Sequence, residues 1–126
     1  MLLIVPIRYF IIVPTLAIST ICAGCNPCKT ETIERSVSPD GKWIAETISA
    51  DCGALTRALV RVNVRPSSVG KASDENNVFV VDNFGTVQAT WKESTTIVVR
   101  CLDCVARNIE TKHESHGPIR VVYDLP

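Results

Sequence analysis

The stretch TRALVRVNVR, residues 56–65, sets a regular series of small apolar residues against mostly polar ones. One set faces one way and comprises Ala58, Val60, Val62 and Val64. The other set faces the opposite way and comprises Leu59, Arg61, Asn63 and Arg65. A period of two is typical of a β-strand with one buried face, whereas an amphipathic helix needs apolar residues three or four apart. We therefore predict a strand over Thr56–Val64.

Similar short segments occur on both sides of this strand. We predict further strands at Thr32–Val37, Lys42–Ser49, Val78–Val81, Thr86–Trp91, Thr95–Cys101, Val105–His113 and Ile119–Tyr123. Turn-forming residues lie between them, as in Ser38-Pro39-Asp40-Gly41, and no segment of this region shows a helical period. The pattern predicts an all-β domain over residues 33–126, a small antiparallel sandwich or partly open barrel of about seven or eight strands.

The first 24 residues predict a signal peptide or a membrane anchor helix. The α-amine and Arg8 form a weakly basic start, and Tyr9–Cys22 is almost continuously apolar. This run is shorter than the roughly 20 residues that span a bilayer, which favours a signal peptide. A longer count from Leu2 would include Arg8, and a retained anchor is the alternative interpretation.

The end of the apolar run, Cys22-Ala23-Gly24-Cys25, resembles the lipobox of bacterial lipoproteins. In that motif small residues precede a cysteine that is acylated and becomes the mature N-terminus. Cys22 departs from the pattern, because leucine is usual there, and cleavage after Ala23 by an ordinary signal peptidase is the alternative. The resemblance implies lipidation of Cys25, which would hold the domain at a membrane surface. The stretch that follows is short, polar and proline-bearing, so we predict a tether over residues 25–32.

The four cysteines beyond the lipobox are disulfide candidates, because exported domains of this size often carry disulfides. They are Cys28, Cys52, Cys101 and Cys104. We favour pairing Cys28 with Cys52 and Cys101 with Cys104, although four cysteines allow three connectivities. The bond from Cys28 to Cys52 closes the longer loop, so we expect its loss to destabilise the domain more. The alternative for Cys101 and Cys104 is a redox pair, although no helix is evident after them to lower a thiol pKa.

Two groups of residues resemble metal-binding motifs, but we predict a metal site at neither. Cys22, Cys25 and Cys28 form C-x-x-C-x-x-C, but cleavage and acylation would remove two of these ligands. His113 and His116 are three residues apart, whereas the zinc motif H-E-x-x-H places its histidines four apart on a helix. We therefore predict an exposed turn there, with no metal, no cofactor and no catalytic residues.

The balance of charges and the positions of the tryptophans bear on the classes of ligand that the domain could bind. The chain has 13 basic and 13 acidic residues, which argues against nucleic-acid binding through phosphate neutralisation. Trp43 and Trp91 sit within strand-like alternation, so we expect core or hairpin aromatics. A shallow binding face is the alternative for either tryptophan.

Several blocks taken together resemble a family of small bacterial envelope proteins of unknown function, many of them described as lipoproteins. The blocks are SPDGKWIA at residues 38–45, DCGALT at 51–56 and NVFVVD at 77–82, followed by Trp91, Thr96–Arg100 and Ile119–Tyr123. The resemblance implies an exported domain and brings no activity with it.

From these patterns we expect an envelope-anchored β domain with a structural or binding role. Its partner would be the membrane, through the lipid or anchor, and another envelope protein is a further candidate. Three alternatives stay open: a thiol–disulfide oxidoreductase using Cys101 and Cys104, a metal hydrolase using His113 and His116, and a small inhibitor or immunity-like module.

Overall fold

The computed structural model describes residues 28–53, 58–82 and 85–126. The predicted signal or anchor segment, Cys25 and the start of the tether lie outside these residues. The strands are β1 (Lys29–Val37), β2 (Trp43–Asp51), β3 (Leu59–Pro66), β4 (Asn77–Asp82), β5 (Gln88–Glu93), β6 (Thr96–Arg100), β7 (Ile109–Lys112), β8 (Ser115–His116) and β9 (Ile119–Asp124). Single turns of 3₁₀ helix occur at η1 (Asp74–Asn76) and η2 (Ala106–Asn108), and the described residues contain no α-helix. The all-β prediction is confirmed.

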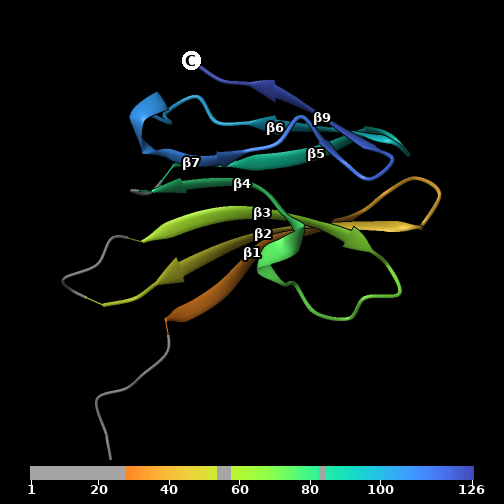
Figure 1. Cartoon of the computed structure of the whole chain (residues 1–126), viewed down its shortest axis with the longest axis horizontal. Coiled ribbons are helices and arrows are strands. Elements are labelled where there is room, and N and C mark those ends of the chain that lie inside the picture. Colours follow the sequence, from red (N-terminus) through yellow and green to blue (C-terminus); the bar gives the residue numbers. More distant parts are fainter. Residues whose placement is uncertain (1–27, 54–57, 83–84) are drawn as a thin grey trace, which may run out of the picture.

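The strands form two sheets that lie on top of each other as a sandwich (Figure 1). One sheet has five antiparallel strands in the order β1-β2-β3-β4-β7. The other has four strands in the order β5-β6-β9-β8. The described strands do not close into a barrel, so the sandwich alternative is the correct one.

The core lies between the two sheets. It contains the inward-facing side chains of both, including Val60, Val62 and Val64 from β3 and Ile97 and Val99 from β6. These β3 residues belong to the set that the alternation grouped on one face. Because burial of apolar surface is the main favourable term in folding, this shared core holds the sheets together.

Both tryptophans pack against this core from its margin, where they are partly buried. The indole N–H of Trp91 donates a hydrogen bond to the backbone oxygen of Ser36, 3.4 Å away, and so links β5 to β1 across the two sheets. Close by, the backbone N–H of Asp40 donates to Ser94 Oγ at 3.1 Å. The prediction of core or hairpin aromatics is therefore correct for Trp43 and Trp91.

Two features of the topology differ from the prediction. β6 and β9 pair in parallel, so the second sheet is mixed. A parallel pair needs a long crossover, and here the connection passes through β7, which belongs to the other sheet. A ninth short strand, β8, lies in the segment predicted to be only a turn, and it pairs with β9 around Gly117 and Pro118.

The boundaries of two strands also differ from the prediction. β1 begins at Lys29, inside the stretch predicted as tether, because Lys29 already pairs with Asp51 of β2. The predicted strand Val105–His113 is shorter, since its first half forms η2.

Across the described ranges, no helix has the length and hydropathy that a bilayer crossing requires.

Candidate functional site

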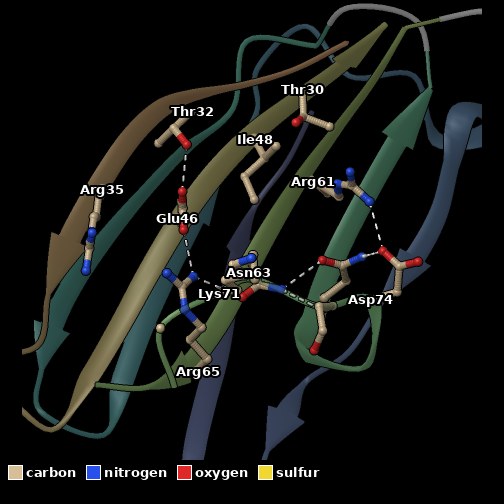
Figure 2. Close-up of a pocket in the computed structure, with 14 residues that line it drawn as sticks. Thr30, Thr32, Arg35, Glu46, Ile48, Arg61, Asn63, Arg65, Lys71 and Asp74 are labelled. Carbon is tan, nitrogen blue, oxygen red and sulfur yellow. Dashed lines mark hydrogen bonds and ion pairs between the residues drawn. The ribbon is translucent and has the colours of Figure 1, made fainter. Parts of the chain in front are cut away.

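The outer face of the five-stranded sheet carries a polar hollow of about 390 Å³ (Figure 2). Strands β1, β2 and β3 form its floor, and the loop from β3 to η1 forms one wall. Its lining is mostly polar and includes Arg35, Glu46, Arg61, Asn63, Arg65 and Lys71. A volume of this size lies in the range of small-molecule sites, although most of those are lined by apolar groups.

The polar set of β3 builds the floor of the hollow and holds its wall. Arg65 is 2% exposed and donates from Nε to the backbone oxygen of Val69 at 3.0 Å. Asn63 is fully buried and donates from Nδ2 to the backbone oxygen of Ser73 at 2.8 Å and to Asn77 Oδ1 at 3.1 Å. Two side chains of one strand thus fix the loop at both of its ends, because buried donors need acceptors.

A partly buried ion pair forms part of the floor. Arg65 Nη1 is 2.6 Å from Glu46 Oε2, and the Thr32 hydroxyl donates to Glu46 Oε1 at 2.6 Å (Figure 2). Burial alone would raise the pKa of Glu46, but the hydrogen bonds from Thr32 and Arg65 outweigh it and hold that pKa below its ordinary value. Glu46 is therefore ionised at neutral pH, and its charge balances that of Arg65.

A second ion pair lies in the lining of the hollow. Arg61 Nη1 is 2.8 Å from Asp74 Oδ1, and the Asp74 side chain is 88% exposed. An exposed pair of this kind contributes little to stability, since solvent screens it. The buried Nε of Arg61 meets no acceptor among the described residues.

A β-bulge in β1 turns Arg35 toward the hollow. Thr32 pairs with Ile48, but Glu34 pairs with Thr47, so Ile33 is the extra residue. In a regular strand, residues 32 and 35 would face opposite sides of the sheet. The bulge places both Thr32 and Arg35 on the hollow's face and leaves Ile33 57% exposed.

The structure joins Cys28 to Cys52 and Cys101 to Cys104, the pairs that the sequence favoured. Neither bond belongs to the lining of the hollow. Cys28 and Cys52 are exposed at the end of the β1–β2 pair, next to the start of β1. Two disulfides in so small a domain are typical of proteins that fold in an oxidising environment.

The surroundings of Cys101 and Cys104 suit a structural bond. Both residues belong to the core, and Asp103 Oδ1 lies 3.3 Å from Cys101 Sγ. The backbone N–H of Thr86 donates to this carboxylate at 2.8 Å and holds the pKa of Asp103 below its ordinary value. A carboxylate so close would disfavour a thiolate at Cys101 after reduction, the opposite of what activates a catalytic cysteine.

The two histidines do not come together as metal ligands. His116 Nε2 is 3.0 Å from Asn76 Oδ1, and its ring meets Trp43 edge-on, with 6.4 Å between ring centroids. In the part of the chain that the structure describes, the only trio of His, Cys, Asp or Glu side chains with ligand atoms within 4.8 Å of one another is Cys101, Asp103 and Cys104. Because the two cysteines form a disulfide, that trio offers no thiolate to a metal.

Sequence reasoning separated the two faces of β3 but missed what covers the polar one. The composition of residues 66–76 indicates an exposed loop, and most of these residues are exposed, but the backbone of this loop also accepts hydrogen bonds from Asn63 and Arg65. The available signal was three polar residues at alternate positions of one strand, opposite a glutamate on the preceding predicted strand. Glu46 pairs with Asn63 across β2 and β3, next to Arg65 on the same face.

Comparison with known protein families, with characterised proteins and with solved structures finds no match to this chain.

Proposed function

We propose that this protein is an exported binding domain, anchored at a membrane surface through its N-terminal segment, with its ligand site in the hollow on the outer face of the five-stranded sheet. The observation that carries the proposal is the network beneath that hollow, in which buried Arg65 and Asn63 join partly buried Glu46. Two buried side chains hold a loop over a sheet face that would otherwise be open to solvent. Buried polar networks are costly unless every member is satisfied, and this one gives a polar site a rigid floor.

The N-terminal half of the proposal rests on composition. Residues 1–24 have the pattern of an export signal, and Cys25 matches the acylated position of the lipobox. Disulfides at Cys28–Cys52 and Cys101–Cys104 are in keeping with the oxidising side of a membrane. The resemblance to small envelope proteins supports the same assignment.

The oxidoreductase and metal-hydrolase alternatives have less support from the geometry. The cysteine pair is buried beside a carboxylate, and the ring of His116 has Asn76 as its partner and does not form a metal-ligand cluster with His113 among the described residues. Nothing in the described residues favours the inhibitor or immunity-like alternative over a small-ligand site.

Ligand binding in the hollow is tested by obstructing it. Gly70 lines the hollow, and a Cβ built there meets nothing within 4 Å, so Gly70→Trp fills space without a backbone clash. Isothermal titration calorimetry would use the full chain in neutral detergent against a panel of neutral sugars, amino acids, small carboxylates and phosphates. We expect saturable binding of at least one class to the wild type and loss of that binding in Gly70→Trp.

The matched control is Ser68→Trp, an exposed position in the same loop that does not line the hollow. It should bind like the wild type. If no class in the panel binds, or if binding survives in Gly70→Trp, the hollow is not a small-ligand site and the proposal is wrong.

A further inference from the structure

The charge balance of the hollow identifies the class of ligand. Its lining carries four cations, Arg35, Arg61, Arg65 and Lys71, and two anions, Glu46 and Asp74. The ion pairs Arg65–Glu46 and Arg61–Asp74 account for two charges of each sign. Neither Arg35 nor Lys71 has a carboxylate within ion-pair distance among the described residues, although the charge of Arg35 also helps to lower the pKa of Glu46.

This excess is local. The whole chain is formally neutral at pH 7, with 13 basic and 13 acidic residues. Two unpaired cations on one polar hollow, next to paired ones, form a positive site on an otherwise balanced surface. Such a site attracts anions and raises their local concentration.

The two unpaired cations come from separate elements that the fold brings together. Arg35 reaches the hollow through the bulge at Ile33, which is one extra residue in β1. Lys71 lies in the loop that Arg65 and Asn63 hold through the carbonyls of Val69 and Ser73. The backbone positions from which the two side chains extend are thus set by the sheet irregularity on one side and by the hydrogen bonds of Arg65 and Asn63 on the other.

The remaining polar groups add donors. Thr30 brings a hydroxyl group from β1, and Arg61 and Arg65 bring guanidinium groups from β3. Guanidinium groups suit oxyanions, because their planar donors bind two oxygens at once. A lysine adds a point charge beside them.

From this placement we propose that the hollow is an oxyanion site that takes a dianionic group of the phosphate-monoester class through Arg35 and Lys71. The inference rests on the proposed binding role of the hollow and names its ligand chemistry. Two unpaired positive charges match a group that carries nearly two negative ones, and a single carboxylate would leave one cation uncompensated. The shared chemistry covers both a soluble phosphate ester and a phosphate-monoester lipid headgroup.

The test uses the full chain in neutral detergent and inorganic phosphate as the probe, at low ionic strength. We expect saturable phosphate binding that weakens about ten-fold or more in Arg35→Gln and in Lys71→Gln, the usual effect of losing a charged hydrogen bond. Both positions are exposed, so neither substitution disturbs the core. Lys92→Gln, at an exposed lysine of β5 on the other sheet, is the matched control and should bind phosphate like the wild type.

Acetate and glucose serve as the monoanionic and neutral comparisons. Equal affinity for acetate and phosphate, or phosphate binding unchanged in both variants, would overturn the oxyanion assignment. If a neutral ligand binds to the wild type but not to Gly70→Trp, and phosphate does not bind, the oxyanion assignment is wrong and the proposed function stands. If nothing in the wider panel binds, both fail together.

A second arm separates the two sources of the phosphate group. The chain would be reconstituted into phosphatidylcholine vesicles with and without phosphatidic acid, whose headgroup is a phosphate monoester. A thermal midpoint that rises with phosphatidic acid in the wild type and not in Arg35→Gln assigns a lipid headgroup, because a ligand of the folded state raises the midpoint. Phosphate binding in solution without that rise assigns a soluble ester, and either result supports the oxyanion site.

Discussion

At the scale of single residues, Gly85 shows how tightly the disulfide Cys101–Cys104 is packed. A Cβ built on Gly85 would lie 2.6 Å from Cys104 Sγ, 3.0 Å from Cys101 Sγ and 3.3 Å from Val81 Cγ1. Real Cβ atoms do not approach sulfur so closely. The residue is glycine because the backbone passes directly over the bond.

Gly85→Ala should therefore lower the free energy of unfolding by roughly 1–3 kcal/mol, the usual cost of overpacking a core. Gly70→Ala, where the added Cβ meets nothing within 4 Å, is the control and should change stability by about 0.5 kcal/mol or less. Chemical denaturation measures both. In a Cys101→Ala/Cys104→Ala background the cost of Gly85→Ala should shrink, and an undiminished cost would show that the sulfur atoms are not its cause.

A second prediction at this scale concerns Glu46. Its pKa lies below its ordinary value in the folded domain, so its ionisation stabilises the fold at neutral pH. That contribution is complete above the unfolded pKa and is lost as pH falls through the folded pKa. Between pH 7 and 3, the wild type should therefore lose more stability than Glu46→Gln.

Denaturant titrations at several pH values measure this difference. Glu46→Gln should itself cost roughly 1–3 kcal/mol at pH 7, because the buried Arg65 loses a charged partner. Asp74→Asn breaks an exposed pair and should leave both the stability and its pH profile close to those of the wild type. Parallel pH profiles for the wild type and Glu46→Gln would mean that the Arg65 pair does not depress the Glu46 pKa.

At the scale of elements, the two disulfides differ in loop length and in burial, and these effects oppose each other. The Cys28–Cys52 bond joins residues 24 apart, whereas the Cys101–Cys104 bond joins residues 3 apart. Loop entropy alone gives about 3 kcal/mol for the first bond and about 2 kcal/mol for the second. However, Cys101 and Cys104 lie in the core, and the first pair is exposed.

The two effects separate when serine and alanine replacements are compared. At Cys28 and Cys52 the double serine and double alanine variants should be equally stable, because water solvates the hydroxyl groups. At Cys101 and Cys104 the double serine variant should be less stable than the double alanine variant by about 2 kcal/mol or more, because two hydroxyls enter an apolar core. Equal stabilities at that pair, measured by chemical denaturation, would contradict the burial of the sulfur atoms.

Eight predicted strands correspond to β1 through β7 and β9, because their alternation and their turn residues are local properties. Partner choice is not local. The parallel β6–β9 pair depends on β7 leaving for the other sheet, and no short-range pattern encodes that. The site could not be predicted from the sequence for the same reason. Arg65 and Asn63 are buried by a loop, and the composition of that loop indicates only that it is exposed.

At the scale of the whole molecule, the anchor is the part of the proposal that chemistry tests most directly. Metabolic labelling with palmitate should mark the wild type if Cys25 is acylated, and Cys25→Ser should abolish the label. Cys52→Ser, which removes a cysteine from the described domain, is the control and should stay labelled. A label that persists in Cys25→Ser would contradict lipidation at this cysteine, and a wild type without label would favour the retained anchor helix.

The early start of β1 limits the space in which an acylated protein could work. Thr30 lines the hollow and follows Cys25 by only five residues. Even a fully extended chain would keep it within about 18 Å of the acylated cysteine. The mouth of the hollow would then stay close to the bilayer surface, so its ligand would have to be a headgroup in the plane of the membrane or a solute small enough to enter the thin aqueous layer above it. Polymers held farther away in the envelope would be out of reach.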